Sequence, residues 1–126
     1  MNFISGFILM VSGSREVESF WLFCSIMSKR KELGDPTMAG LSGMFTEHFP
    51  MLFMYVKVFH EFFEEFLPEL SEHLSDLPDA LWINKWIQTL FLYSFPYGLC
   101  IRIWDNVFSH GTKFLIQAAL GILSLI

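Results

Sequence analysis

The chain has 126 residues, which fits one domain of ordinary size, and its net charge of −5 belongs to a sequence that is 53% hydrophobic and 17% aromatic. Its one basic cluster is Lys29-Arg30-Lys31, so nucleic acid is not an expected partner, because binding phosphates requires a basic face. The mean hydropathy of +0.46 indicates more apolar surface than so small a domain hides readily, which leaves a membrane protein or a piece of a larger helical domain.

The apolar segments are too short for the membrane explanation. A membrane-spanning helix needs about 20 consecutive apolar residues. Segments 3–11 and 114–126 fall short of that length, and Pro96 interrupts the longer segment 86–101. The first apolar run also lacks the preceding basic residue of a secretory signal peptide. We therefore expect no membrane span.

Two helices are predicted in the first 31 residues. Residues 1–12 are predicted to form an apolar helix that begins without an N-cap residue or a charge, which is typical of a helix whose start is missing. Ser14 is a suitable N-cap for an amphipathic helix over residues 15–31, which the basic cluster closes. The predicted apolar stripe of this second helix consists of Val17, Phe20, Trp21, Cys24 and Met27.

The longest periodic run follows a loop predicted at residues 32–44. Pro68 must kink this run or start a new helix, so we expect one helix over residues 46–66 and a shorter one over 68–75. The polar side of the run carries Lys57, Glu61, Glu64 and Glu72. Its apolar stripe consists of Phe49, Leu52, Phe53, Val56, Phe59, Phe63, Phe66, Leu67, Leu70 and Leu74.

The rest of the chain is expected to cover the segment 81–108. Residues 81–94 are apolar on nearly every side, which predicts a helix buried all round. A corner at residues 95–98 follows, because Pro96 suits the first turn of a new helix. That helix folds back on the first and buries the face formed by Cys100, Ile103, Trp104, Val107 and Phe108.

A last apolar helix is predicted over residues 112–126, after a turn at Gly111. No alternating strand pattern occurs in the sequence, so the predicted fold class is all-α, with about six helices.

Arg102 and Asp105 form the one polar pair of this central segment, at positions i and i+3. The pair could belong to a functional site or hold two helices in register. We favour the structural role, because Ile103 and Trp104 lie between the two charged residues. If the pair is buried, removing one partner should cost about 3–5 kcal/mol.

The remaining polar residues give no catalytic constellation, and we expect neither a metal nor a cofactor. The acidic residues Glu61, Glu64, Glu65, Glu69 and Glu72 predict a solvated face rather than a di-iron site, because no Glu-x-x-His occurs. His60 and Glu64 are spaced as a surface pair. Cys24 and Cys100 fall on apolar faces and are expected to be buried reduced thiols, with a disulfide as the alternative.

An ordered set of short motifs resembles the TBC domain of Rab GTPase-activating proteins over essentially the whole chain. The most recognisable motifs lie in the second half of the sequence and include the family-motif residues Trp86, Arg102, Trp104 and Asp105. The motifs are Met1-Asn2-Phe3-Ile4, Glu18-Ser19-Phe20-Trp21-Leu22-Phe23, the approach at 41–53, Asn84-Lys85-Trp86, Leu90-Phe91, Phe95-Pro96, Arg102-Ile103-Trp104-Asp105, Gly111, Lys113 and Ala118-Ala119.

The resemblance implies an all-helical activator of a Rab-type small GTPase, not an enzyme itself, that works in vesicle traffic. It implies a cytoplasmic protein at the surface of endomembranes. In this family an arginine from Ile-x-x-Asp-x-x-Arg and a glutamine from Tyr-x-Gln-Gly enter the GTPase active site. An arginine finger is worth about 10³–10⁵ in the rate of GTP hydrolysis.

The sequence departs from the family pattern at both fingers. Arg15, Arg30 and Arg102 lie outside the arginine motif, and the family's Tyr-x-Gln-Gly comes immediately before the Met-Asn that is residues 1 and 2 here. Residues 1–126 are therefore expected to be a partial domain without catalytic residues, in which Met1 and Asn2 face the GTPase. The alternatives are a non-catalytic GTPase-binding or helical scaffold module, and a truncated product that self-associates through exposed apolar helices.

Overall fold

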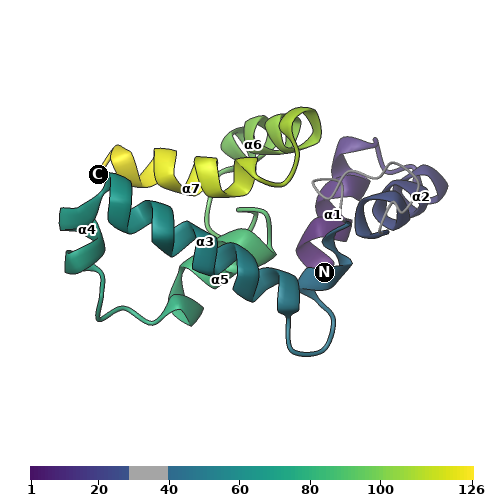
Figure 1. Cartoon of the computed structure of the whole chain (residues 1–126). Coiled ribbons are helices and arrows are strands. Elements are labelled where there is room, and N and C mark those ends of the chain that lie inside the picture. Colours follow the sequence, from purple (N-terminus) through teal and green to yellow (C-terminus); the bar gives the residue numbers. More distant parts are fainter. Residues whose placement is uncertain (29–39) are drawn as a thin grey trace.

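A computed structural model describes residues 1–28 and 40–126, and within these ranges the chain is all helical, without strands. The predicted all-α class is confirmed, with one helix more than expected (Figure 1). The α-helices are α1 (Asn2–Val11), α2 (Glu16–Met27), α3 (Pro50–Phe66), α4 (Pro68–His73), α5 (Ile83–Gln88), α6 (Tyr97–His110) and α7 (Phe114–Ser124), and the 3₁₀ helices are η3 (Leu41–Met44) and η4 (Asp79–Leu81).

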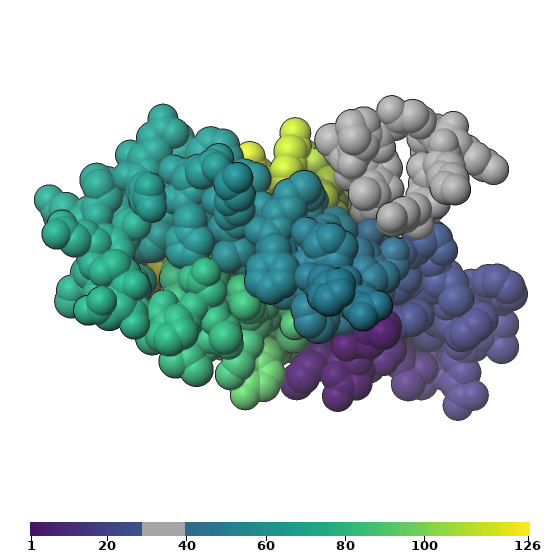
Figure 2. All heavy atoms as spheres, turned by 60° about the horizontal axis from the view of Figure 1, so that its bottom comes forward, coloured from purple at the N-terminus to yellow at the C-terminus, as the bar shows by residue number. Residues whose placement is uncertain are grey.

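Helices α3 and α7 lie side by side and run in the same direction, with α6 packed on α7 (Figure 1). The Tyr55 hydroxyl of α3 is hydrogen bonded to the Thr112 hydroxyl just before α7. Helices α1 and α2 pack on each other at one end of the molecule, and α4 lies at the other end (Figure 2). The described helices therefore share one apolar core in an elongated molecule (Figure 2).

The buried side of α3 agrees with the predicted period. Val56, Phe59 and Phe63 are at most 5% exposed, and the charged residues predicted to lie opposite them are exposed. The helix begins at Pro50 rather than at residue 46, because His48 and Phe49 have φ values of 65° and 47°, outside the right-handed helical region.

The predictions for the two ends of the α3 stripe were mixed. Pro68 starts the short helix α4, as expected. Phe53 and Phe66, however, are exposed, so the predicted stripe is wider than the buried one. These two phenylalanines lie beside the core-facing positions and remain on the surface of the described structure.

The predicted long helix over residues 81–94 is wrong. Helix α5 ends at Gln88, and Leu90 and Phe91 follow with φ values of 51° and 68°. Both residues are buried, whereas Tyr93 is exposed. The chain therefore makes a tight reversal, which we call the 89–95 turn, in place of two more helical turns.

Hydrogen bonds from α6 hold the 89–95 turn. The indole Nε1–H of Trp104 donates to the Leu90 carbonyl at 3.1 Å, and the Cys100 thiol lies 3.4 Å from the Phe91 carbonyl. Both bonds are buried, where an unpaired carbonyl costs about 1–3 kcal/mol. Helix α6 therefore packs on this turn, as the sequence predicted for its Cys100–Trp104 face, while Phe108 is exposed.

Aromatic rings complete the packing of the turn. The Trp86 ring lies 4.9 Å from the Phe95 ring, centroid to centroid, and 6.0 Å from the Phe91 ring. From the other side, Phe7 of α1 packs on Trp104 at 4.5 Å. Trp104 of α6 thus contacts both the 89–95 turn and α1, although α1 is distant from both in sequence.

The predicted stripe of α2 is also wrong. Val17, Phe20 and Trp21 are exposed, and the one buried residue of α2 is Ser19. The reversal at Gly13 and Ser14, with φ values of 70° and 62°, places Ser19 against Ser12 of α1, and their hydroxyls are hydrogen bonded. Ser14 is therefore part of the turn rather than the N-cap. The basic cluster at 29–31 lies outside the described residues.

Two polar expectations change as well. The His60 ring nitrogen Nε2 lies 2.8 Å from Asp79 Oδ1, so His60 pairs with Asp79 rather than with Glu64. This pair joins α3 to η4. Cys100 is buried, as expected, but Cys24 is only half-buried, and both are free thiols. Within the described ranges, no helix combines the length and apolarity needed to cross a bilayer.

We predict that Trp104→Phe lowers the free energy of unfolding by about 1–3 kcal/mol, because it keeps an aromatic ring but leaves the buried Leu90 carbonyl without its indole donor. Urea denaturation followed by circular dichroism measures the change. Trp21→Phe is the matched control: Trp21 is 66% exposed, so its replacement should cost less than about 0.5 kcal/mol. Equal effects of the two substitutions would contradict the anchoring role.

Candidate functional site

A cleft of about 340 Å³ lies between α1 and the segment that leads from the 89–95 turn into α6. We call it the α1 cleft. Its lining is almost entirely apolar and consists of Asn2, Phe3, Gly6, Phe7, Met10, Leu92, Phe95, Tyr97 and Cys100.

The floor of the α1 cleft is buried and its rim is exposed. Phe7 and Cys100 are buried at the floor, where Phe7 also contacts the Tyr97 ring at 5.7 Å. Met10 and Tyr97 stand on the rim and are 64% and 48% exposed. Gly6 has open space where a side chain would project, so its missing side chain contributes to the hollow.

An aromatic edge extends the cleft beyond the first turn of α1. Phe3 meets the Tyr93 ring edge-on at 5.5 Å, and the Lys85 ammonium lies 5.0 Å from the centre of that ring. A cation over an aromatic face is favoured electrostatically. Met1 and Asn2, the residues expected to face a GTPase, are exposed at this same edge. The surface thus combines exposed aromatic rings with a single positive charge.

The chemistry of this surface suits binding rather than catalysis. Burial raises the pKa of its Cys100 thiol above the ordinary value, so the reactive thiolate is disfavoured. No group of three potential metal-ligating side chains occurs among residues 1–28 and 40–126. Exposed Tyr, Phe and Met side chains around an apolar hollow are the composition typical of protein–protein interfaces.

The four family-motif residues separate into two kinds. Trp86 and Trp104 support the 89–95 turn from either side. Arg102 and Asp105 are both exposed, and these two described residues form no ion pair. The structure does not show the favoured structural role, a charged pair that holds two helices in register: the i, i+3 spacing places both side chains on the solvent side of α6, away from its Cys100–Trp104 face.

Comparisons with known proteins show the family of this chain. The family model described as "Rab-GTPase-TBC domain" matches residues 1–126. The chain belongs to the Rab-GTPase-TBC domain family. Trp104, which the sequence resemblance singled out, is the residue that anchors the 89–95 turn in the structure.

Several curated relatives share this domain. TBC1 domain family member 12 of Xenopus tropicalis is 32% identical over 99% of this chain, and that match covers 17% of the relative. TBC1 domain family member 14 of Homo sapiens is 40% identical over 60% of this chain. Growth hormone-regulated TBC protein 1 of Rattus norvegicus is 29% identical, and the match covers 39% of its length. The chain thus spans well under half of each relative. No solved structure gives a significant match.

The sequence singled out Met1, Asn2, Trp86 and Trp104, and the structure brings all four to the α1 cleft or to the turn beside it. Sequence reasoning missed Gly6, Tyr93 and Tyr97. The aromatic content of residues 91–97 was the available signal, but the reversal that turns these rings toward α1 depends on contacts with α6.

We expect Arg102→Ala to change the free energy of unfolding by less than about 0.5 kcal/mol, because the side chain is exposed and unpaired with Asp105. Asp105→Asn should behave in the same way. Thermal and urea denaturation measure both. A loss of about 3–5 kcal/mol in either variant would instead indicate the buried ion pair that the structure does not have.

The two cysteines should differ in reactivity. Cys100 is 1% exposed and its thiol pKa is raised by burial, so at pH 8 we expect iodoacetamide to alkylate Cys24 at least about tenfold faster. Mass spectrometry of peptides from timed reactions gives both rates. In urea the rates should converge. Equal rates in the native chain would show that the floor of the α1 cleft is open.

Proposed function

We propose that this chain is the C-terminal part of a GTPase-activating domain that acts on a Rab-type small GTPase in vesicle traffic. The observation that carries the proposal is the match of the family model to residues 1–126. We place the working complex at the cytoplasmic surface of endomembranes, where GTPases of this class act. The partner is a protein, and the reaction is hydrolysis of the GTP that the partner holds.

In this proposal, the α1 cleft and its edge face the GTPase. The family's glutamine motif comes immediately before a Met-Asn pair, which corresponds to Met1 and Asn2. Both residues are exposed, and Asn2 lines the cleft together with Phe3 and Tyr97. Apolar and aromatic surface of this kind supplies binding energy to an interface, and the floor below it is buried.

The residues of this chain bind and position, and the charge stabilisation of hydrolysis comes from motifs that its sequence does not contain. Gln88 is followed by Thr89 and Gln117 by Ala118, so neither glutamine belongs to a Tyr-x-Gln-Gly motif. None of the three arginines lies in Ile-x-x-Asp-x-x-Arg. Without the arginine finger, the charge on the transferring phosphoryl group is not stabilised by this chain. Without the glutamine finger, the attacking water is not oriented by it.

We expect the purified chain to leave the GTP hydrolysis rate of any Rab-type GTPase at its intrinsic value. A chimera should restore stimulation, in which a segment that carries the family's arginine and glutamine motifs is joined directly before Met1. Phosphate release under single-turnover conditions measures both rates. Stimulation of about 10³-fold or more is expected for the chimera, as for arginine fingers in general. Strong stimulation by the chain alone would overturn the proposal.

A pair of glycine substitutions in the chimera tests the cleft itself. Gly6→Leu fills the α1 cleft, and we expect it to lower the stimulated rate at least about tenfold, a loss near 1.4 kcal/mol. Gly121→Leu is the matched control, because Gly121 also lies in a helix with open space around it, on α7. Equal rates for the two variants would remove the α1 cleft from the interface.

The second candidate function is a module that binds a GTPase without activating it. The combination of an intact α1 cleft with no finger motif favours it. Isothermal titration of the chain with GTP-loaded Rab proteins tests this function. Saturable binding without a change in hydrolysis rate supports it, and the absence of binding to every Rab tested contradicts it.

A further inference from the structure

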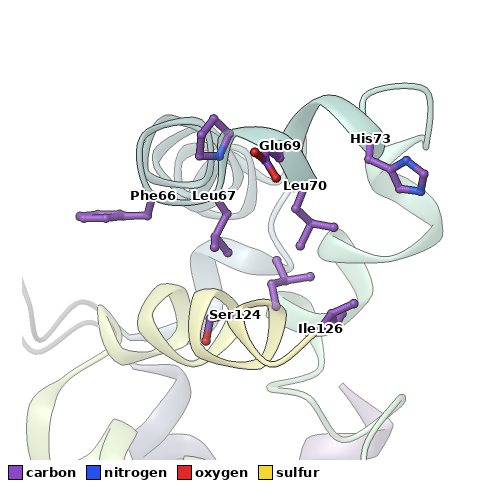
Figure 3. A pocket seen from close by; sticks show the side chains of 9 residues that line it. Phe66, Leu67, Glu69, Leu70, His73, Ser124 and Ile126 are labelled. Carbon is purple, nitrogen blue, oxygen red and sulfur yellow. The ribbon is translucent and has the colours of Figure 1, made fainter.

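A second hollow, of about 650 Å³, lies at the opposite end of the molecule from the α1 cleft, between α4 and the last turn of α7 (Figure 3). We call it the α4 groove. Its principal lining residues are Phe66, Leu67, Leu70, His73, Leu123 and Ile126.

The α4 groove has an apolar floor and apolar flanks. Leu67 and Leu70 point from the α3–α4 side toward α7, where Leu123 is 3% exposed (Figure 3). Phe66 and Ile126 are 63% and 85% exposed at the flanks. Such a surface suits the apolar face of a helix, which presents anchors at positions i, i+3, i+4 and i+7.

The chain segment on one side of the groove is acidic. Between Lys57 and Lys85 the sequence carries seven of the chain's 13 acidic residues and none of its eight lysines and arginines. Glu69 lines the groove, and Glu72 lies one turn further along the same helix, α4; we call these two exposed residues the acidic rim. On the other side, α7 (Phe114–Ser124) contains no charged residue.

We propose that the α4 groove docks a basic amphipathic helical segment of a partner protein. Its apolar face would occupy the floor formed by Leu67, Leu70 and Leu123, and its lysines or arginines would pair with the acidic rim. Electrostatic complementarity of this kind fixes the orientation of a helix and raises the rate of association. The site is separate from the α1 cleft, so the proposal does not depend on the proposed GTPase-activating function.

Charge argues against the other occupants. A second copy of the chain would bring an identical acidic rim to the interface, and the two rims would repel. An anionic lipid surface would be repelled for the same reason. A neutral apolar segment could fill the floor but would leave the rim without partners. A basic amphipathic segment satisfies both features of the groove.

The test uses a fluorescein-labelled peptide of about 18 residues, with leucines at one helical face and lysines elsewhere, titrated with the 126-residue chain. We expect saturable binding by fluorescence anisotropy that weakens as salt rises. Glu69→Lys combined with Glu72→Lys should weaken binding at least about tenfold. A peptide with glutamate at every lysine position should not bind.

Glu16→Lys combined with Glu18→Lys provides the matched control, because it changes net charge equally on exposed positions of α2, at the other end of the molecule. We expect less than about a twofold effect from it at physiological salt, because screening limits long-range attraction. Equal effects of the two double variants, binding of the glutamate peptide, or no saturable binding would each overturn the proposal. Self-association of the chain that excludes the peptide would do so as well.

Discussion

The hydrogen bond from the Trp104 indole to the Leu90 carbonyl holds the turn on which the arrangement of this domain depends. Leu90 and Phe91 adopt left-handed backbone conformations, each of which costs roughly 1–2 kcal/mol for a residue with a side chain. Burial of both side chains and the contacts of Trp86 offset that cost. Because Phe7 of α1 packs on Trp104, the position of α1 depends on this turn as well.

This dependence gives the α1 cleft its shape. The turn delivers Leu92, Phe95 and Tyr97 to the side of α1 that Gly6 leaves open. The other end of the molecule has a different character, because the acidic rim of the α4 groove lies beside an apolar floor, whereas the edge of the α1 cleft carries one lysine over an aromatic ring. The two surfaces therefore select partners of different charge, and they can be occupied at the same time.

The sequence predicted well those helices whose boundaries are marked by local chemistry. Pro68 and Pro96 begin or precede helices, as predicted, and Gly111 ends α6 with a φ of 87°. The end of α5 could not be predicted, because neither glycine nor proline marks residues 89–91 and the left-handed conformations are imposed by α6. The buried side of α2 was also ambiguous, since apolar residues occupy several of its faces. Its orientation follows from the Ser12–Ser19 contact with α1. The sequence singled out residues of the α1 cleft in separate motifs, but it could not show that they lie together, because the conformation of the 89–95 turn depends on α6.

We propose that the first turn of α1 and the rim beside it contact the GTPase, on a support built by Trp104. Hydrogen–deuterium exchange of the finger-bearing chimera, with and without a GTP-loaded Rab-type GTPase that it activates, tests this contact. We expect slower exchange in α1 (Asn2–Val11) and in residues 92–100 when the GTPase is present, with α4 (Pro68–His73) unchanged. Protection confined to α4 or α7, with α1 exchanging at its free rate, would contradict it.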